Sequence, residues 1–382
     1  RLGLSVVLLE KSTFPRHKIC GDFLSPGTVS MLESLGLARQ ALERSGAAPV
    51  CLSGMRITLE GTQIRSGYPE GRPGWGLSRR DLDALLARRA EAAGARLVES
   101  LQVRSFSRAG PDAWRVEGTH PDGTRRAWIA RLLVEAGGRH GPIARRLGWN
   151  GADPRLVRFA LWSHMEGVRG LSGMGEMHLF EGGYVGVAAL DESGLANVTM
   201  VIDAPHMRRA RGDVRAYFLS VLASHLELGR RLQSARFAAP LRGLGPLALR
   251  ARRVAGDGIA LVGDAGGFVD PFTGEGVNVA LASAQMLAQA VAANGPGRPA
   301  AEAEYARAWR RGFNRKFVLC RALQSVLSRP FLARRVARAL ASRRDLAERL
   351  VAATGDLAPP ASVMGPSYLT SLLLAAATSA RA

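Results

Sequence analysis

The spacing of apolar positions along the chain changes repeatedly between the period of a strand and that of a helix. Short continuous apolar runs at residues 6–9 and 259–262 are typical of parallel strands covered on both faces. Alternating segments between residues 101 and 131, and again between 156 and 203, predict antiparallel strands, and residues 55–67 predict a hairpin. Helical spacing predicts helices over about 28–37, within 77–94, over 213–233, from 277 onward and over 299–354.

These elements predict an α/β protein in which parallel-sheet segments are interleaved with antiparallel ones. Ligands of open α/β sheets bind at the carboxyl ends of the parallel strands, where glycine turns recur in this chain. Ser78, followed by Asp81, predicts the capped start of one helix of the parallel region. We expect a first domain made of residues 1–46, 75–150 and 250–295. A second domain, made of residues 47–74 and 151–249, is inserted into it, and residues 296–382 form a C-terminal helical region.

A glycine-rich turn with one aspartate, Asp264, separates the strand at 259–262 from the helix that begins near Val277. Glycine permits positive φ and lets another group approach the backbone closely. The start of the helix presents unpaired N–H groups and the positive end of its dipole. We therefore expect this turn to hold an extended ligand that is polar or anionic.

The first strand of the chain ends on a carboxylate, Glu10. In dinucleotide-binding βαβ units, an acidic residue at the end of the second strand accepts hydrogen bonds from a ribose. The glycine loop of such a unit lies about 20 residues upstream. We expect the first strand and this loop to precede Arg1; the alternative is a surface glutamate that follows a strand.

The charge of the chain is unusual, at +20 over 382 residues, while its 47% hydrophobic and 22% charged contents are ordinary for a globular protein. Of the 52 basic residues only three are lysines, and the arginines are spread along the whole chain without interleaved aromatic residues. This pattern argues against a nucleic-acid partner. Attraction to anionic lipid surfaces accounts for the positive charge better than nucleic-acid binding does. Peripheral membrane association is therefore an alternative to a purely cytoplasmic location.

Cysteine and histidine spacing indicates no metal site. The three cysteines are far apart, which excludes a disulfide framework, and the seven histidines form no HxH or HxxxH pair. We find no signal peptide and expect no apolar run long enough to cross a membrane, so the expected location is the cytoplasm.

Two stretches carry a family resemblance: "GDAGGFVDPFTGEGVNVA" at 263–280 and "RHKICGDFLSPG" at 16–27. They resemble FAD-dependent oxidoreductases of the geranylgeranyl reductase type, relatives of para-hydroxybenzoate-hydroxylase-like monooxygenases and flavin-dependent halogenases. The resemblance extends from residue 1 to about residue 294. It implies FAD as cofactor, a glutathione-reductase-type FAD-binding domain and a substrate domain whose sheet covers the flavin.

The resemblance also implies the cofactor contacts. Glu10 corresponds to the adenosine-ribose ligand, Arg79 with Asp83 to an R-x-x-x-D helix start that reaches FAD, and Val103 to a backbone contact with adenine. Asp264 corresponds to the residue that binds the ribityl chain. The turn and helix start around it correspond to contacts with the flavin ring edge and pyrophosphate, namely Gly263, Gly274, Gly276, Val277 and Asn278.

We expect an apolar substrate pocket between the flavin and residues 182–190, with Cys20 on the opposite wall. The segment "GGYVGVAAL" has no charged side chain, and neither it nor the Cys20 loop offers a histidine–carboxylate dyad. Proton delivery is therefore expected from Cys20, Tyr184 or water. The alternative for Cys20 is a buried packing residue.

Departures from the family pattern narrow the function. Residues 135–138 read Glu-Ala-Gly-Gly where an Ala-Asp-Gly turn is usual, which argues against NADPH-driven hydroxylation. The Trp-x-Trp-x-Ile-Pro segment of the halogenases and the W-x-F-P-K pattern of geranylgeranyl reductases have no counterpart here. We expect FAD-dependent reduction of a double bond in a hydrophobic, isoprenoid- or polyketide-like substrate, with NAD(P)H or ferredoxin as donor. The alternatives are an FAD-dependent monooxygenase and a non-catalytic flavin-binding module.

Overall fold

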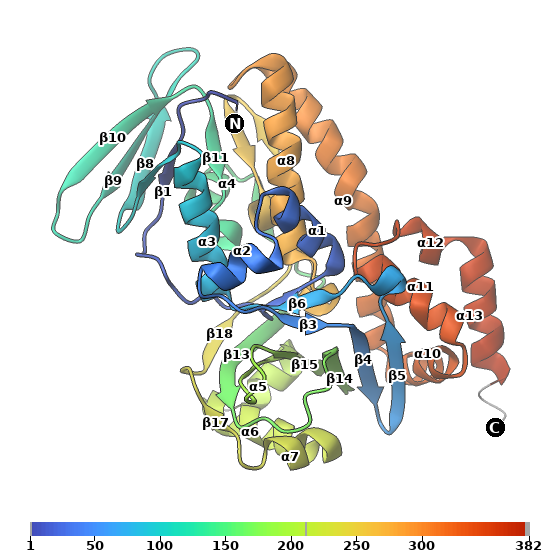
Figure 1. Ribbon diagram of the computed structural model, residues 1–382. Coiled ribbons are helices and arrows are strands. Elements are labelled where there is room, and N and C mark those ends of the chain that lie inside the picture. The colour runs from blue at the N-terminus through green and yellow to red at the C-terminus, as the bar shows by residue number, and fades with distance from the viewer. Residues whose placement is uncertain (1, 211, 379–382) are drawn as a thin grey trace.

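A computed structural model describes residues 2–210 and 212–378 of the chain as two β-rich regions on either side of a small sheet, with a group of helices along one side (Figure 1). The small sheet has the strand order β2–β6–β3. The bounds of these strands are Phe23–Leu24 for β2, Gly74–Gly76 for β6 and Val50–Leu52 for β3.

The first β-rich region contains the parallel strands that the apolar runs predict. Strand β1 pairs in parallel with β7, and β11 pairs in parallel with β21, which is flanked by β20. The bounds are Val7–Leu9 for β1, Arg96–Val98 for β7, Leu133–Glu135 for β11, Ile259–Leu261 for β21 and Ala255–Gly256 for β20. The expected meander is the antiparallel sheet of β8 (Gln102–Arg108), β9 (Trp114–Thr119) and β10 (Arg125–Ala130).

Helices flank this region. In α3 (Arg79–Ala92), the Ser78 hydroxyl accepts a hydrogen bond from the Asp81 amide at 3.2 Å, as the sequence predicts. The long helix of the region is α8 (Gly276–Asn294), which packs against α1 and α9. The remaining short elements are α1 (Pro26–Ser34), α2 (Arg39–Arg44), α4 (Pro142–Arg146), β12 (Asn150–Ala152) and β19 (Leu249–Ala251).

The second β-rich region is an eight-stranded sheet of the order β17–β13–β16–β15–β14–β4–β5, with β18 also paired to β13. Its pairs are antiparallel except for β14 with β4, which are parallel, although alternation alone predicts antiparallel strands. The bounds are Arg236–Phe237 (β17), Arg158–Glu166 (β13), Ala196–Asp203 (β16), Gly183–Ala189 (β15), Gly175–Phe180 (β14), Gly54–Leu59 (β4), Thr62–Gly67 (β5) and Arg242–Leu244 (β18).

Three helices cover one face of this sheet: α5 (Ala204–Arg209), α6 (Val214–Ser224) and α7 (Leu226–Leu232). The expectation of a single helix over residues 213–233 is wrong. The chain leaves helical geometry at His225, whose side chain accepts a hydrogen bond from the Leu228 amide and so caps a new helix.

The C-terminal helices pack against the other face of the sheet, with α10 and α11 in contact with β5. Leu319, Leu340 and Leu346 from these helices share one buried cluster with Tyr184 and Val201 of the sheet. The helices are α9 (Pro299–Leu327), α10 (Pro330–Ser342), α11 (Arg344–Thr354), α12 (Ala361–Met364) and α13 (Pro366–Thr378).

Helix α8 corrects one expectation from the sequence. By length and composition it is a candidate membrane span, since it has 19 residues and an 18-residue window of mean hydropathy 1.3. In the structure 39% of that window is buried, and on this buried face Val279, Leu287 and Val291 join a cluster with Tyr305 and Trp309.

Candidate active site

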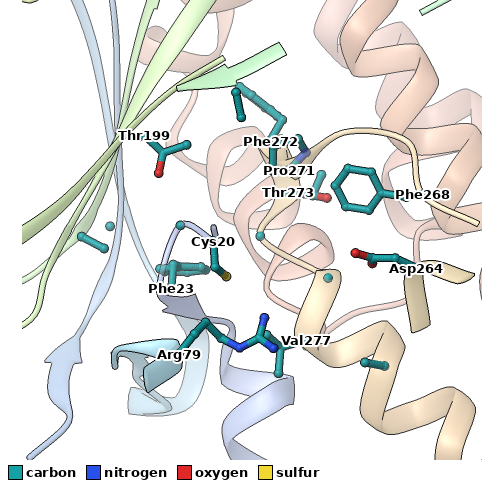
Figure 2. Close-up of a pocket in the computed structure, with 18 of the residues that line it drawn as sticks. Cys20, Phe23, Arg79, Thr199, Asp264, Phe268, Pro271, Phe272, Thr273 and Val277 are labelled. Carbon is teal, nitrogen blue, oxygen red and sulfur yellow. The ribbon is translucent and has the colours of Figure 1, made fainter. Parts of the chain in front are cut away.

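A cavity of about 410 Å³ lies where the two β-rich regions and the C-terminal helices meet. Its walls come from the loop after β1, the strands β14 and β15, the turn after β21, and helices α9 and α11. The predicted site residues that line it are Cys20, Arg79, Tyr184, Gly263, Asp264, Gly274, Gly276 and Val277. Figure 2 shows that Cys20, Phe23 and Arg79 approach the cavity opposite Asp264 and Phe268.

Three predicted residues do not line this cavity. The Glu10 carboxylate accepts hydrogen bonds from the Ser12 amide and the Arg16 guanidinium, both at 2.9 Å. Val103 packs into a cluster beneath the meander. The Asn278 side chain contacts Lys316 and Met31. Their assignment as cofactor ligands stays a prediction.

The turn after β21 is shaped by glycine. Gly274 has φ +68°, in the left-handed region, and a Cβ built on it would lie 2.7 Å from the Phe23 ring. Another side chain here would therefore be strained and would also clash. The Gly263 amide donates to the Ser283 hydroxyl at 2.9 Å, which ties the turn to α8.

Asp264 supplies a carboxylate to the cavity. Burial raises its pKa, while the positive charges of Lys18, Arg79 and Arg139 act in the opposite direction. The carboxylate accepts no hydrogen bond from the residues that the structure describes. It is therefore an open acceptor, and Figure 2 shows it directed into the cavity.

Three cations line the same end of the cavity, namely Lys18, Arg79 and Arg139. Asp83 holds Arg79 by two hydrogen bonds, of 2.7 and 3.0 Å. Burial lowers the pKa of both Lys18 and Arg139. The Nε and Nη1 atoms of Arg139 are buried without a hydrogen-bond partner among the described residues. This part of the cavity is therefore suited to an anion.

The turn at residues 135–138 keeps a carboxylate although the expected aspartate is absent. The buried Glu135 side chain accepts from the Gly137 amide and from the Ile143 amide, each at 2.9 Å. A Cβ on Gly141 would lie 2.4 Å from the Glu135 carboxyl carbon, so the turn is built around this group. Glu135 therefore holds the turn through its backbone amides and does not line the cavity, so it does not take the place of the missing aspartate there.

A buried network behind the Cys20 loop was missed from the sequence. Asp22 Oδ2 lies 2.6 Å from His164 Nε2 and accepts from Asn197 Nδ2 at 2.7 Å. Its Oδ1 accepts from the Arg79 amide at 2.9 Å. The expected absence of a dyad within the loop concerned the loop alone. The structure pairs Asp22 of the loop with a histidine from another segment, His164 on β13, and neither residue lines the cavity. The one local signal is the position of Asp22 directly after the Cys-Gly pair.

Asn197 fixes the loop itself, since its Nδ2 also donates to the Cys20 carbonyl at 2.7 Å. Burial raises the pKa of the Cys20 thiol, and the adjacent Arg79 opposes this effect. Cys20 therefore faces the cavity as a neutral thiol at physiological pH. Across the cavity, the Tyr184 hydroxyl donates to Asp270 at 2.6 Å.

Comparison with known families identifies the family of the chain and its cofactor. The family described as "FAD binding domain" matches residues 1–308. The chain belongs to this family. The predicted cofactor, FAD, and the predicted fold class of an FAD-binding α/β domain with an interleaved antiparallel sheet are thereby confirmed.

Relatives of this flavoprotein include enzymes of two kinds. The flavin-dependent halogenase armH3 of Armillaria mellea is 26% identical over 328 residues, covering 77% of this chain and 64% of the halogenase. The menaquinone reductase of Mycobacterium tuberculosis is 26% identical over 298 residues, covering 76% of this chain and 71% of the reductase. The flavoprotein thus spans just under two thirds of the halogenase's length.

Solved structures share the fold. The flavin-dependent halogenase CmlS superposes with a TM-score of 0.77 at 23% identity, over 97% of this chain and 74% of CmlS. A flavoprotein/dehydrogenase from Cytophaga hutchinsonii superposes with a TM-score of 0.82 at 18% identity, over 98% of this chain and 92% of that protein.

The residues of the cavity fit FAD. The unpartnered nitrogens of Arg139 are suited to a diphosphate oxygen, and the open carboxylate of Asp264 is suited to the hydroxyls of a ribityl chain. Gly276 also lines the cavity, and a Cβ built on it would have no neighbour closer than 3.9 Å, so the backbone there is open to the approach of a planar ring. The electropositive end and the glycine turn together form the cofactor end of the cavity.

Proposed function

We propose that this flavoprotein is an oxidoreductase that reduces an activated double bond in a hydrophobic, isoprenoid- or polyketide-like substrate. The observation that carries the proposal is that one continuous cavity joins the cofactor end to an apolar chamber. Bound FAD in its reduced form supplies the hydride.

The chamber is lined by aliphatic and aromatic side chains from both the sheet and the C-terminal helices. Met55, Ile57 and Met177 come from the sheet, and Leu323 and Leu350 come from the helices. Ligand sites of this kind bind apolar molecules and fix them with a few polar groups.

Glu176 borders the cavity, but its carboxylate is held elsewhere, by His178 and Arg231. The polar groups left to the chamber are hydroxyls and a thiol, notably Tyr184, Thr199 and Cys20. Such a chamber offers little to hold a charged metabolite and favours a neutral, extended one.

The test is anaerobic turnover of the flavin-loaded protein. After reduction with NADH, NADPH or ferredoxin, the protein is mixed with prenylated quinones and with polyketide enones, and products are identified by mass spectrometry. A mass gain of two hydrogens supports the proposal. Product that forms only with oxygen, and that carries an added oxygen or halogen atom, contradicts it and favours monooxygenase or halogenase chemistry. A loaded protein that turns over none of these substrates supports a non-catalytic flavin-binding module.

Replacing Cys20 with alanine is expected to lower kcat for substrate reduction by about tenfold while FAD affinity changes less than twofold. The thiol borders the cavity and contacts Arg79, but Asp83 holds the Arg79 guanidinium by two hydrogen bonds, so the cofactor contacts are expected to remain. Cys51→Ala, outside the cavity, is the matched control. Unchanged turnover in Cys20→Ala would reduce Cys20 to a packing residue.

A further inference from the structure

Tyr184, on the wall of the cavity, is bonded to a buried carboxylate. Its hydroxyl donates to Asp270 Oδ1 at 2.6 Å, and the Phe272 amide donates to the same oxygen at 3.0 Å. Tyr184 and Asp270 are only 2% and 4% exposed. The pair therefore lies between the cavity and the protein interior.

The second oxygen of Asp270 faces an arginine across a gap. Arg158 Nε is 3.9 Å from Asp270 Oδ2, beyond hydrogen-bond distance. Asp270 Oδ2 and Arg158 Nη1 are both buried, and neither has a hydrogen-bond partner among the described residues. Buried polar atoms of this kind are costly unless they are bonded. A water molecule bound to both atoms would satisfy them.

Arg158 also borders a second, smaller hollow of about 20 Å³. A water molecule needs only about 10–15 Å³ of such volume, so the hollow has room for one. The exposed residues Glu60 and Glu181 stand at its edge. Arg158 thus borders the hollow and also faces Asp270, which places it between the surface of the protein and the Tyr184–Asp270 pair.

We propose that Tyr184 protonates the substrate and that Asp270, through water held by Arg158, restores the proton from solvent. This inference rests on the proposed reduction of a double bond. It gives Asp270 and Arg158 a role in proton supply. The residues next to them in the sequence do not indicate this role.

The step balances as follows. Hydride addition to one carbon of the double bond leaves an electron pair on the other carbon or on a conjugated oxygen. The Oη–H bond of Tyr184 breaks, and a C–H or O–H bond forms on the substrate. For this transfer the Tyr184 hydroxyl turns from Asp270 Oδ1, to which it donates in the resting structure, toward the substrate. The Asp270 carboxyl group then gives a proton to Tyr184 Oη and takes one from the water at Arg158. The hydroxide left by that water exchanges with solvent through the hollow.

The electrostatics of the pair suit this exchange. Burial raises the pKa of Asp270, while the Arg158 charge and the hydrogen bonds from Tyr184 and Phe272 oppose the shift. Burial and Asp270 together raise the pKa of Tyr184 well above its usual value, so the phenolate regains its proton readily.

The experiment compares Tyr184→Phe, Asp270→Asn and the double variant in anaerobic reduction of the substrate by the flavin-loaded protein. Each single variant is expected to lower kcat by about a hundredfold or more, the range of general acid catalysis, with KM and FAD affinity within threefold of wild type. The double variant is expected to be no slower than the slower single variant, because both residues serve one proton path. Tyr68→Phe, on the same cavity wall, is the control.

One further measurement and one substitute variant strengthen the test. Infrared spectroscopy of the wild type is expected to show a protonated-carboxyl band that Asp270→Asn removes, a result that requires no turnover. If Asp270→Asn fails to fold, Arg158→Lys, which keeps the positive charge but moves it, replaces it.

Three outcomes overturn the relay: kcat within threefold of wild type in Tyr184→Phe, an unaffected Asp270→Asn, or losses that multiply in the double variant. If the wild type reduces no olefin, the proposed function fails instead, and the infrared band still decides whether Asp270 stores a proton.

Discussion

Asp264→Ala is expected to weaken FAD binding by between about tenfold and about a hundredfold. A hydrogen bond to a charged group contributes roughly 1.5–3 kcal/mol, and about 1.4 kcal/mol corresponds to a factor of ten in affinity. Asp264 is the open carboxylate at the cofactor end of the cavity, and the described residues leave it no other partner. The measurement is titration of the flavin-free protein with FAD, followed by quenching of flavin fluorescence.

The matched control is Asp257→Ala. Asp257 lies just before β21, is half exposed and pairs with Arg253, so it shares the local chain but not the cavity. Its variant is expected to bind FAD as the wild type does. Equal affinity in the Asp264 and Asp257 variants would contradict the assignment of the turn after β21 as the ribityl site.

Glu176→Ala is expected to destabilise the fold by about 3–5 kcal/mol, the cost of leaving buried charges without their partner. Glu176 accepts from Arg231 Nη1 and Nη2 at 2.6 and 2.9 Å and contacts His178 Nε2 at 2.9 Å. Arg56, also buried, lies 3.7 Å away. Urea unfolding followed by circular dichroism measures the loss. The control is Glu117→Ala, which removes an exposed ion pair with Arg115 and should leave the stability nearly unchanged.

The same carboxylate gives a pH dependence of known sign. Burial alone would raise the pKa of Glu176, but hydrogen bonds from His178 and Arg231 outweigh it and lower the pKa from 4.5 to about 2. A carboxyl whose pKa is lowered by folding stabilises the protein above its unfolded pKa and loses that contribution as pH falls through the folded value. The stability gap between wild type and Glu176→Gln should therefore narrow between about pH 4.5 and pH 2. A constant gap over this range would show that Glu176 is not the titrating group.

Features that depend on neighbouring residues could be predicted from the sequence. The Ser78 cap, the meander and the strand–glycine–helix unit around Asp264 each follow from residues a few positions apart. The sequence predicts a cofactor site at this turn for the same reason, and the structure places the turn on the wall of the cavity.

Features that join distant segments could not be predicted in this way. Asp22 and His164 are 142 positions apart, and Tyr184 and Asp270 are 86 positions apart. Each side chain alone reads as an ordinary residue of a loop or a strand, and only the pairing of sheets and turns brings them together. The sequence did not predict the break at His225, because the helical spacing of apolar residues continues from α6 into α7.

The wall of the substrate chamber has a consequence for how the protein's specificity changes during evolution. Leu323, Leu350 and Thr354 line the chamber, yet all three lie beyond residue 308, where the match to the FAD binding domain family ends. Substitutions in this segment are therefore expected to change which molecules the chamber admits while leaving the residues of the cofactor end untouched. Chimeras that swap residues 319–354 between homologous proteins should accordingly transfer substrate preference and leave flavin loading intact.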